Sequence, residues 1–419
     1  MQNSNNAFNV DLERLLKKYL GEDWFNTVYL RENLTNETSD EVSEKISDFY
    51  KDQLKINVHN YSERIKIDRT ITYSEKNLPA NKFCEFLLNL GNLCLANGKL
   101  TIAGEIFRKA NNTSSDISIK AESILGLAEI YSRRAAWSRS FKLISEAESL
   151  YKNTEDKIGK AKCENILGTI YGEMGDIDSA RSHLLTGLNL VKTDLNLINA
   201  KKDLEMVAKI ETNLGIVESI LGNSADSIRY LNAAMNTYKQ LDYKKNEAEV
   251  NLNIALVYLE SGMPEAAVTV LDEGISLAKE YKLMSVLCLF YLAKSEALIA
   301  METLYYAAEF ADKALELSHY LDDKLSLADL YRVKGIIERK LKNYSSAENY
   351  LLDSLRINSS LKNEKNIAET SFELAMLYKE MDNANSKQSY LKRSLDYFNQ
   401  ISAAEKVKRI QELIGAEAA

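Results

Sequence analysis

The residues that most often carry out catalysis are few in this chain and stand apart from one another. The three histidines, His59, His183 and His319, are isolated in the sequence. The phosphate-binding motifs Gly-x-Gly-x-x-Gly and Gly-Lys-Ser/Thr are absent, as are the zinc motif His-Glu-x-x-His and the serine-hydrolase motif Gly-x-Ser-x-Gly. The sequence therefore predicts no catalytic residues, no cofactor and no metal site, and the protein is not expected to be an enzyme.

Acidic and thiol side chains are able to bind metal ions, but their spacing here favours structural roles. Asp176 and Asp178 follow Gly175 in a short segment between two apolar-periodic stretches, where a carboxylate is expected to cap the next helix. The cysteines form no Cys-x-x-Cys pair and are expected to be buried, reduced thiols; they are Cys84, Cys94, Cys163 and Cys288.

The elements that position these side chains repeat along the chain. A small residue returns in helical context, and its last five occurrences are 40 residues apart: Gly91, Ala128, Gly168, Gly215, Ala255, Ser295, Gly335 and Ala375. A fixed period of this size is typical of a stacked repeat array. Proline, which a helix interior tolerates least, occurs only at positions 79 and 264. The sequence therefore predicts an all-α protein built as a solenoid.

Residues 248–280 show how one repeat is built. Val250, Ile254 and Val257 recur at helical spacing and give a first helix one apolar stripe. Gly262 is able to take the left-handed conformation after that helix, and Pro264 fits the first turn of a second helix. Each unit is predicted to be a helical hairpin that buries its apolar stripes by stacking on its neighbours.

These hairpins resemble the tetratricopeptide repeat. The resemblance rests on a large apolar residue before the small one, an aromatic three positions later, and small and large apolar residues on the second helix. Good matches are Leu90-Gly91 with Ala103 and Phe107, Leu167-Gly168 with Tyr171, Ala180 and Leu184, and Ile254-Ala255 with Tyr258, Ala267 and Leu271. The resemblance covers about residues 81–396 as about eight units, and it implies a right-handed superhelical solenoid of stacked helical hairpins.

The period exceeds the 34 residues usual for this repeat. The longer variant resembles the repeats of LGN-type scaffolds, kinesin light chains and bacterial peptide-sensing regulators of the Rap kind. The step from Gly168 to Gly215 is 47 residues, so residues 192–204 are expected to hold an inserted turn or lengthened helices.

The two ends of the chain fall outside the repeat register. Residues 1–80 are predicted to form an N-terminal helical cap or a small bundle, with one short helix ending at Gly21 and a second over about 39–65. Residues 397–419 are predicted to hold a C-terminal capping helix, because residues 404–415 have an amphipathic pattern.

In the tetratricopeptide family the first helices line a concave groove, and positions 2, 5, 9, 12 and 13 of each unit point into it. With the small residue at position 8, the resemblance implies a partner-binding groove lined by Asn165, Thr169, Thr212, Ile216, Leu252, Leu256, Leu259, Glu296, Arg332, Ile336, Arg339 and Phe372. This groove is expected to be polar in the third unit, apolar in the fifth and sixth, and basic with apolar patches in the seventh and eighth.

Two features of this lining indicate binding. Leu252, Leu256 and Leu259 lie at helical spacing and give the first helix of the fifth unit an apolar side. An exposed apolar side of this kind marks a binding site unless a tight superhelix or the C-terminal helix buries it. Arg332 and Arg339 are able to engage carboxylates or phosphates, the alternative being a solvated rim.

Composition narrows the class of partner. The chain has 53 basic and 61 acidic residues and a net charge of −8, which argues against a nucleic-acid partner. The N-terminus has no signal-peptide pattern, and the longest apolar stretch, residues 283–293, is too short to span a membrane. A cytoplasmic protein without a membrane partner is expected, and the oligomeric state stays open.

Three functions are compatible with these observations. The first is a protein–protein interaction scaffold that binds a peptide or protein segment in its groove. The second is a bacterial signalling regulator with a peptide-sensing groove and an N-terminal effector bundle. The third is the sensing half of a larger enzyme whose output domain is absent from this sequence.

Overall fold

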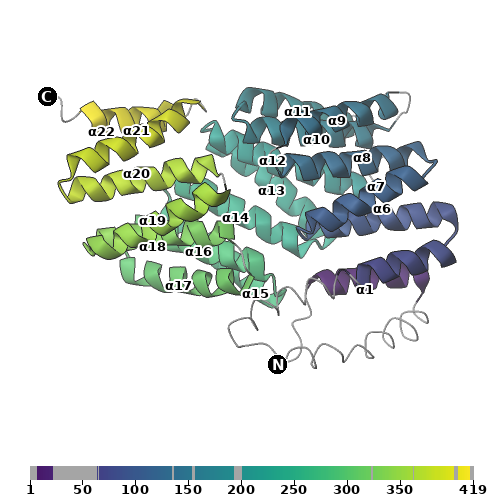
Figure 1. Cartoon of the computed structure of the whole chain (residues 1–419), viewed down its shortest axis with the longest axis horizontal. Coiled ribbons are helices and arrows are strands. Elements are labelled where there is room, and N and C mark those ends of the chain that lie inside the picture. The colour runs from purple at the N-terminus through teal and green to yellow at the C-terminus, as the bar shows by residue number, and fades with distance from the viewer. Residues whose placement is uncertain are drawn as a thin grey trace, which may run out of the picture. The chain divides into compact units, whose positions relative to one another are not determined.

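A computed structural model describes residues 7–21, 64, 66–134, 136–152, 156–192, 201–321, 324–361, 363–400 and 404–415. Within these ranges every regular element is a helix and no strand occurs, so the predicted all-α class is confirmed (Figure 1). His59 and almost all of the helix predicted over residues 39–65 lie outside the described residues.

The chain divides into two compact units, Met1–Leu167 and Gly168–Ala419. The first unit contains α1 (Ala7–Leu20), a helical stretch over 66–77, α6 (Ala80–Ala96), α7 (Leu100–Thr113), α8 (Ile117–Ser132), α9 (Trp137–Tyr151) and the start of α10 (Lys157–Glu173). Leu12 and Leu16 of α1 are buried in one cluster with Phe86 and Phe107 of the first hairpin. The N-terminal helix therefore shares the core of the repeats that follow it.

The second unit continues the hairpins to the C-terminus. It contains α11 (Ile177–Lys192), α12 (Lys201–Ile220), α13 (Ser224–Leu241), α14 (Lys244–Glu260), α15 (Pro264–Glu280), α16 (Met284–Ala300), α17 (Leu304–Leu321), α18 (Lys324–Lys340), α19 (Tyr344–Leu361), α20 (Glu364–Glu380), α21 (Ala384–Gln400) and α22 (Ala404–Gly415). From α12 onward each described helix packs against the next, and each even-numbered helix also contacts the even-numbered helix of the neighbouring hairpin, as α14 contacts α16. At 20 residues, α12 is longer than its neighbours, as expected for the stretch that breaks the 40-residue register.

The small residue of each unit lies where its two helices touch. A Cβ atom added to Gly215 would lie 2.6 Å from Cγ of Leu231, sixteen residues later on the second helix. The same contact with the residue sixteen positions on recurs at Gly168 with Leu184 (2.5 Å) and at Gly335 with Leu351 (2.6 Å). Because real Cβ contacts are never this short, the period of the sequence reflects a close approach of two helices.

The turns inside the hairpins use a left-handed residue after the first helix. Gly262 has φ +71° and Pro264 begins α15, as the sequence predicts. At the same place in the next three units the chain has Glu302, Lys342 and Asp382, with φ of 59°, 64° and 56°. A left-handed residue with a Cβ costs roughly 1–2 kcal/mol. The later hairpins therefore store strain that glycine would relieve.

Lys342→Gly is expected to stabilise the fold by about 0.5–1 kcal/mol, since relief of the left-handed strain exceeds the entropy cost of glycine. Gly262→Lys is the reciprocal variant, and it should destabilise by a similar amount because nothing lies within 4 Å of a Cβ there and only the backbone is affected. Urea unfolding of both variants measures the two shifts. Equal midpoints for wild type and Lys342→Gly would show that Lys342 is not strained.

Candidate functional site

The residues predicted to line a binding groove all lie on first helices, and we call the side on which they lie the first-helix face. Asn165 belongs to the first compact unit and is half-buried. The other eleven belong to the second unit, on α10, α12, α14, α16, α18 and α20: Thr169, Thr212, Ile216, Leu252, Leu256, Leu259, Glu296, Arg332, Ile336, Arg339 and Phe372.

One part of this face is apolar and open to solvent. Leu256 of α14 is 37% exposed, Ile216 and Ile220 of α12 are 39% and 58% exposed, and Leu289 of α16 is 37% exposed. We call Ile216, Ile220, Leu256 and Leu289 the apolar strip. Leu252 and Leu259 are half-buried against the hydrophobic core, so burial explains these two leucines and not Leu256. Large apolar side chains exposed on consecutive first helices are typical of an interaction surface.

The remaining predicted residues of this part contribute less to a binding surface. The Thr212 hydroxyl donates a hydrogen bond to the Ala208 carbonyl of its own helix (2.8 Å). Ile336 packs in part against the core, and Thr169 is half-buried. Sequence reasoning missed Ile220 and Leu289, although they occupy positions 13 and 2 of their units and were therefore open to the same inference.

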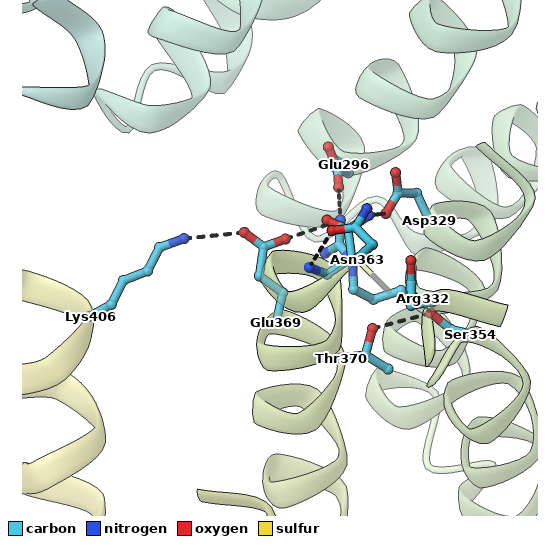
Figure 2. A network of polar contacts seen from close by, with 10 residues as sticks. Glu296, Asp329, Arg332, Ser354, Asn363, Glu369, Thr370 and Lys406 are labelled. Carbon is cyan, nitrogen blue, oxygen red and sulfur yellow. Dashed lines mark hydrogen bonds and ion pairs between the residues drawn. The ribbon is translucent and has the colours of Figure 1, made fainter. Parts of the chain in front are cut away.

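The second part of the face is a charged network centred on Arg332 of α18. The Nη2 atom of Arg332 lies 3.1 Å from a carboxylate oxygen of Glu296 on α16 and 4.0 Å from one of Glu369 on α20. Lys406 of α22 pairs with the other oxygen of Glu369 at 3.2 Å. Figure 2 shows the Arg332 guanidinium between these groups, with Lys406 approaching Glu369 from the far side. Four helices are thus joined by one set of ion pairs.

Burial sets the protonation of these carboxylates. Asp329, which accepts a hydrogen bond from Asn366 Nδ2 at 2.8 Å, has its pKa raised to about 6 because burial outweighs the attraction of Arg332. Burial also raises the pKa of Glu296, against the opposing charge of Arg332. Burial also acts to raise the pKa of Glu369, but Arg332, Lys365 and Lys406 together hold that pKa below the usual value. The network is therefore only partly ionised near pH 6.

A second arginine makes a similar cluster about two turns further along α18. Arg339 is 14% exposed, pairs with Glu373 of α20 at 2.9 Å and also pairs with Glu380 at the end of that helix. The Nε atoms of Arg332 and Arg339 are buried and have no hydrogen-bond acceptor among the described residues. The expected basic character of the seventh and eighth units is therefore corrected, because carboxylates of neighbouring helices neutralise both arginines.

Phe372 lies beside the C-terminal helix. Its ring packs in the cluster formed by α20, α21 and α22, which includes the buried Ile410. The Arg409 guanidinium lies 5.1 Å from the centre of the ring, within the range of a cation–π contact. α22 therefore covers part of the first-helix face of the eighth unit.

Comparison with known proteins identifies the repeat. Residues 206–280 match the tetratricopeptide repeat family model. Residues 206–280 are therefore tetratricopeptide repeats, and the hairpins on either side share the helical-hairpin fold of that segment. A stretch of 57% of the chain is 20% identical to the Tonsoku-like protein of Drosophila melanogaster, and it spans only 18% of the length of that relative.

Solved structures share the fold of this chain at low sequence identity. Aspartyl phosphate phosphatase F from Bacillus subtilis is 12% identical with a TM-score of 0.55, over 97% of both chains. A Rap protein complexed with Competence and Sporulation Factor is 11% identical with a TM-score of 0.57, over 80% of this chain and 97% of that one. A signal transduction ATPase from Pyrococcus horikoshii with a tetratricopeptide repeat sensor is 16% identical with a TM-score of 0.57, over 87% of this chain and 56% of that one.

His183, Asp176 and the cysteines, which were considered for chemistry, make structural contacts or are buried in the described part of the chain. His183 stacks on Tyr171 with ring centres 5.1 Å apart. Asp176 accepts hydrogen bonds from the backbone N–H and hydroxyl of Ser179, as expected for a cap. All four cysteines are buried thiols outside any disulfide, as predicted. The described residues contain no group of acidic, histidine or cysteine side chains arranged to hold a metal, and no described helix is long and apolar enough to cross a bilayer.

Asp329→Asn is expected to stabilise the tetratricopeptide-repeat fold at pH 7.5 by on the order of 1 kcal/mol and to have no effect below about pH 4. The folded-state pKa of Asp329 is above its unfolded value, so its stabilising contribution is present below the unfolded pKa and is lost as the pH rises through about 6. The carboxylate is faced by Arg332 of its own helix, by Glu296, and by Lys365, Asn366 and Glu369 of α20.

Thermal unfolding between pH 4 and pH 8 measures this difference. Asp353→Asn is the matched control, since Asp353 is 46% exposed and pairs only along its own helix with Arg356. A pH-independent difference between Asp329→Asn and wild type would contradict the assignment of the raised pKa to Asp329.

Proposed function

We propose that this protein is a cytoplasmic interaction scaffold without catalytic activity, and that it binds a peptide or protein segment on the first-helix face of its second unit. The observation that carries the proposal is the apolar strip, in which Ile216, Leu256 and Leu289 are each more than one third exposed on three consecutive first helices. A binding segment that covers these side chains removes apolar surface from water. The proposed function involves neither a nucleic-acid partner nor a membrane partner.

Proteins of similar fold support this proposal. The names of two such structures describe a Rap protein complexed with Competence and Sporulation Factor and NprR in complex with its cognate peptide NprX. NprR is 14% identical with a TM-score of 0.55 and is covered over 97% of its chain. Tetratricopeptide solenoids also present one continuous face of first helices, which suits an elongated partner.

Leu256→Asp is expected to weaken the binding of selected peptides by about tenfold or more, because burying a leucine on a partner contributes roughly 1.5–3 kcal/mol. The experiment selects binders of the wild-type chain from a library of random 12-residue peptides and measures their affinity by fluorescence anisotropy. Thermal stability of the variant should stay close to wild type because Leu256 is already 37% exposed.

Leu352→Asp is the control for this experiment, since Leu352 is 38% exposed on α19, a second helix. The proposal requires that peptides bind Leu352→Asp as well as wild type. If no peptide is enriched, or if the two variants bind the enriched peptides equally, the first-helix face is not the binding surface.

A signalling regulator is the second candidate. It is favoured by the fold shared with aspartyl phosphate phosphatase F, which extends over 97% of this chain. Deleting residues 1–80 would remove Leu12 and Leu16 from the core of the first unit, so deletion tests folding as well as function. A photo-crosslinking residue in place of Arg14, whose side chain is 78% exposed, leaves that core intact. A protein crosslinked from position 14 in cells favours a regulator, and none favours the scaffold.

The third candidate is the sensing part of a longer enzyme. It is favoured by the signal transduction ATPase, because the chain matches only 56% of that protein, whose name includes a tetratricopeptide repeat sensor. Sequencing the full open reading frame that encodes this chain tests this candidate. An output domain in the same frame favours the enzyme over the scaffold.

A further inference from the structure

A carboxylate lies next to the apolar strip. Glu260 follows Leu256 by four residues on α14, so the two side chains are neighbours on one face of the helix. Glu260 is exposed and accepts a hydrogen bond from the Ser219 hydroxyl of α12 at 2.7 Å. It is the last residue of α14, where the helix dipole adds negative potential. A group that binds here meets an anion beside exposed apolar side chains.

The charged groups named here are closely paired on the C-terminal side of this point and weakly paired on the side of α12. Toward the C-terminus, Glu296 is bound to Arg332 and the arginines of α18 are covered by carboxylates. Toward the start of α12, Lys209 lies seven residues before Ile216 and is 4.0 Å from Glu205 of its own helix. Among these described groups the arginines of α18 are neutralised and Lys209 has a weak partner, whereas Glu260 offers an exposed carboxylate four residues from Leu256 on the same helix.

The eighth unit shows that a first-helix face of this chain is able to bind a helix, although at other positions of the unit. Glu369 and Phe372 occupy positions 2 and 5 of the eighth unit, and both are contacted by α22. The contacts are a lysine on the carboxylate, Lys406 at 3.2 Å, and an arginine over the ring, Arg409 at 5.1 Å. Ile410 of the same helix is 1% exposed against this part of the core. A first-helix face of this protein thus accommodates a basic amphipathic helix.

We propose that the partner of the apolar strip is a basic amphipathic segment, which places apolar side chains on Ile216, Leu256 and Leu289 and a lysine or arginine on Glu260. This inference rests on the proposed scaffold function and names the chemistry of its partner. The stem of a lysine or arginine lies along apolar surface while its charged end reaches the carboxylate. The charge gives the segment an orientation along α14 as well as affinity.

Three fluorescein-labelled 12-residue peptides test the proposal on the full chain. They share one amphipathic pattern of leucines and carry lysine, glutamine or glutamate at the polar positions. We expect the lysine peptide to bind about tenfold more tightly than the glutamine peptide by anisotropy, and the glutamate peptide not to reach saturation. Raising the salt concentration to 0.5 M should reduce the preference for lysine, because exposed charges are screened.

Glu260→Gln should weaken the lysine peptide about threefold and leave the glutamine peptide unchanged, as expected for one exposed ion pair. Glu273→Gln, on the exposed side of the second helix α15, makes the same change in net charge and should have no effect. The proposal fails if glutamine and lysine peptides bind equally, if no peptide binds, or if the two glutamate variants behave alike. If all three peptides bind equally well and Leu256→Ala abolishes their binding, the proposal of a basic partner is wrong and the proposed scaffold function stands.

Discussion

Gly215→Leu is expected to lower the unfolding midpoint of the chain by several degrees and to broaden or split the transition. The Cβ of any side chain at this position meets Cγ of Leu231 at 2.6 Å and the Ser227 carbonyl oxygen at 3.3 Å, so α12 and α13 must separate. Overpacking of this kind typically costs roughly 1–3 kcal/mol. In a solenoid the cost falls on one hairpin and its two interfaces, because stability is a sum of neighbour terms.

Gly172→Leu is the control for the same substitution on a first helix. A Cβ at Gly172 has only Ala180 Cβ within 4 Å, at an ordinary contact distance of 3.8 Å. Differential scanning calorimetry should show a clearly smaller shift for Gly172→Leu than for Gly215→Leu. Similar melting curves for Gly215→Leu and wild type would mean that α12 and α13 do not approach closely at Gly215.

The hairpins could be predicted from the sequence because their contacts are local and repeat. The small residue at position 8 contacts the residue sixteen positions later, as Gly168 contacts Leu184 and Gly335 contacts Leu351. Both members of each pair lie within one period, so a single sequence shows the constraint several times over. The same reasoning located the helix over 404–415, whose amphipathic pattern matches α22. The division of residues 1–80, 81–396 and 397–419 into separate parts stays a prediction.

The left-handed backbone conformation of the turns could be predicted from the sequence only where a glycine occupies the turn position. Gly262 has the φ of +71° that its residue type favours, whereas Lys342 takes φ +64° against its own preference. Packing of the flanking helices imposes the left-handed conformation on Lys342. No residue in the turn itself indicates this conformation. Tertiary packing therefore decides the backbone conformation of the later turns.

The charge of the first-helix face could not be predicted from positions 5, 9 and 12 alone. Arg332 and Arg339 at positions 5 and 12 predict a basic surface. Glu296, at position 9 of the preceding unit, pairs with Arg332, but the other carboxylates that neutralise the two arginines come from the next first helix. Glu369 and Glu380 hold positions 2 and 13, so applying these two positions to the sequence would have found them. Pairing between helices about 40 residues apart still depends on the reach of each side chain, which periodicity does not specify.

Arg332→Met is expected to destabilise the fold by roughly 3 kcal/mol at pH 8, since breaking one side of a buried ion pair leaves uncompensated charge. The Arg332 side chain is 16% exposed and holds Glu296 and Glu369, and its charge also stabilises the ionised form of Asp329. Methionine keeps most of the apolar stem, so the loss reports the charge and not the packing. The pairing of Lys406 with Glu369 should weaken only slightly, because α22 is also held by the buried Ile410.

The loss in Arg332→Met should shrink as the pH falls toward 5. Without the guanidinium, burial raises the pKa values of Glu296 and Asp329 further, so these groups take up protons in the folded state and its relative stability rises at lower pH. Arg356→Met is the control, because Arg356 is 77% exposed and its pair with Asp353 lies along one helix, where such pairs contribute about 0.5 kcal/mol or less. Urea unfolding at pH 5 and pH 8 separates the two variants. A pH-independent loss in Arg332→Met would place its role in packing rather than in compensating the buried carboxylates.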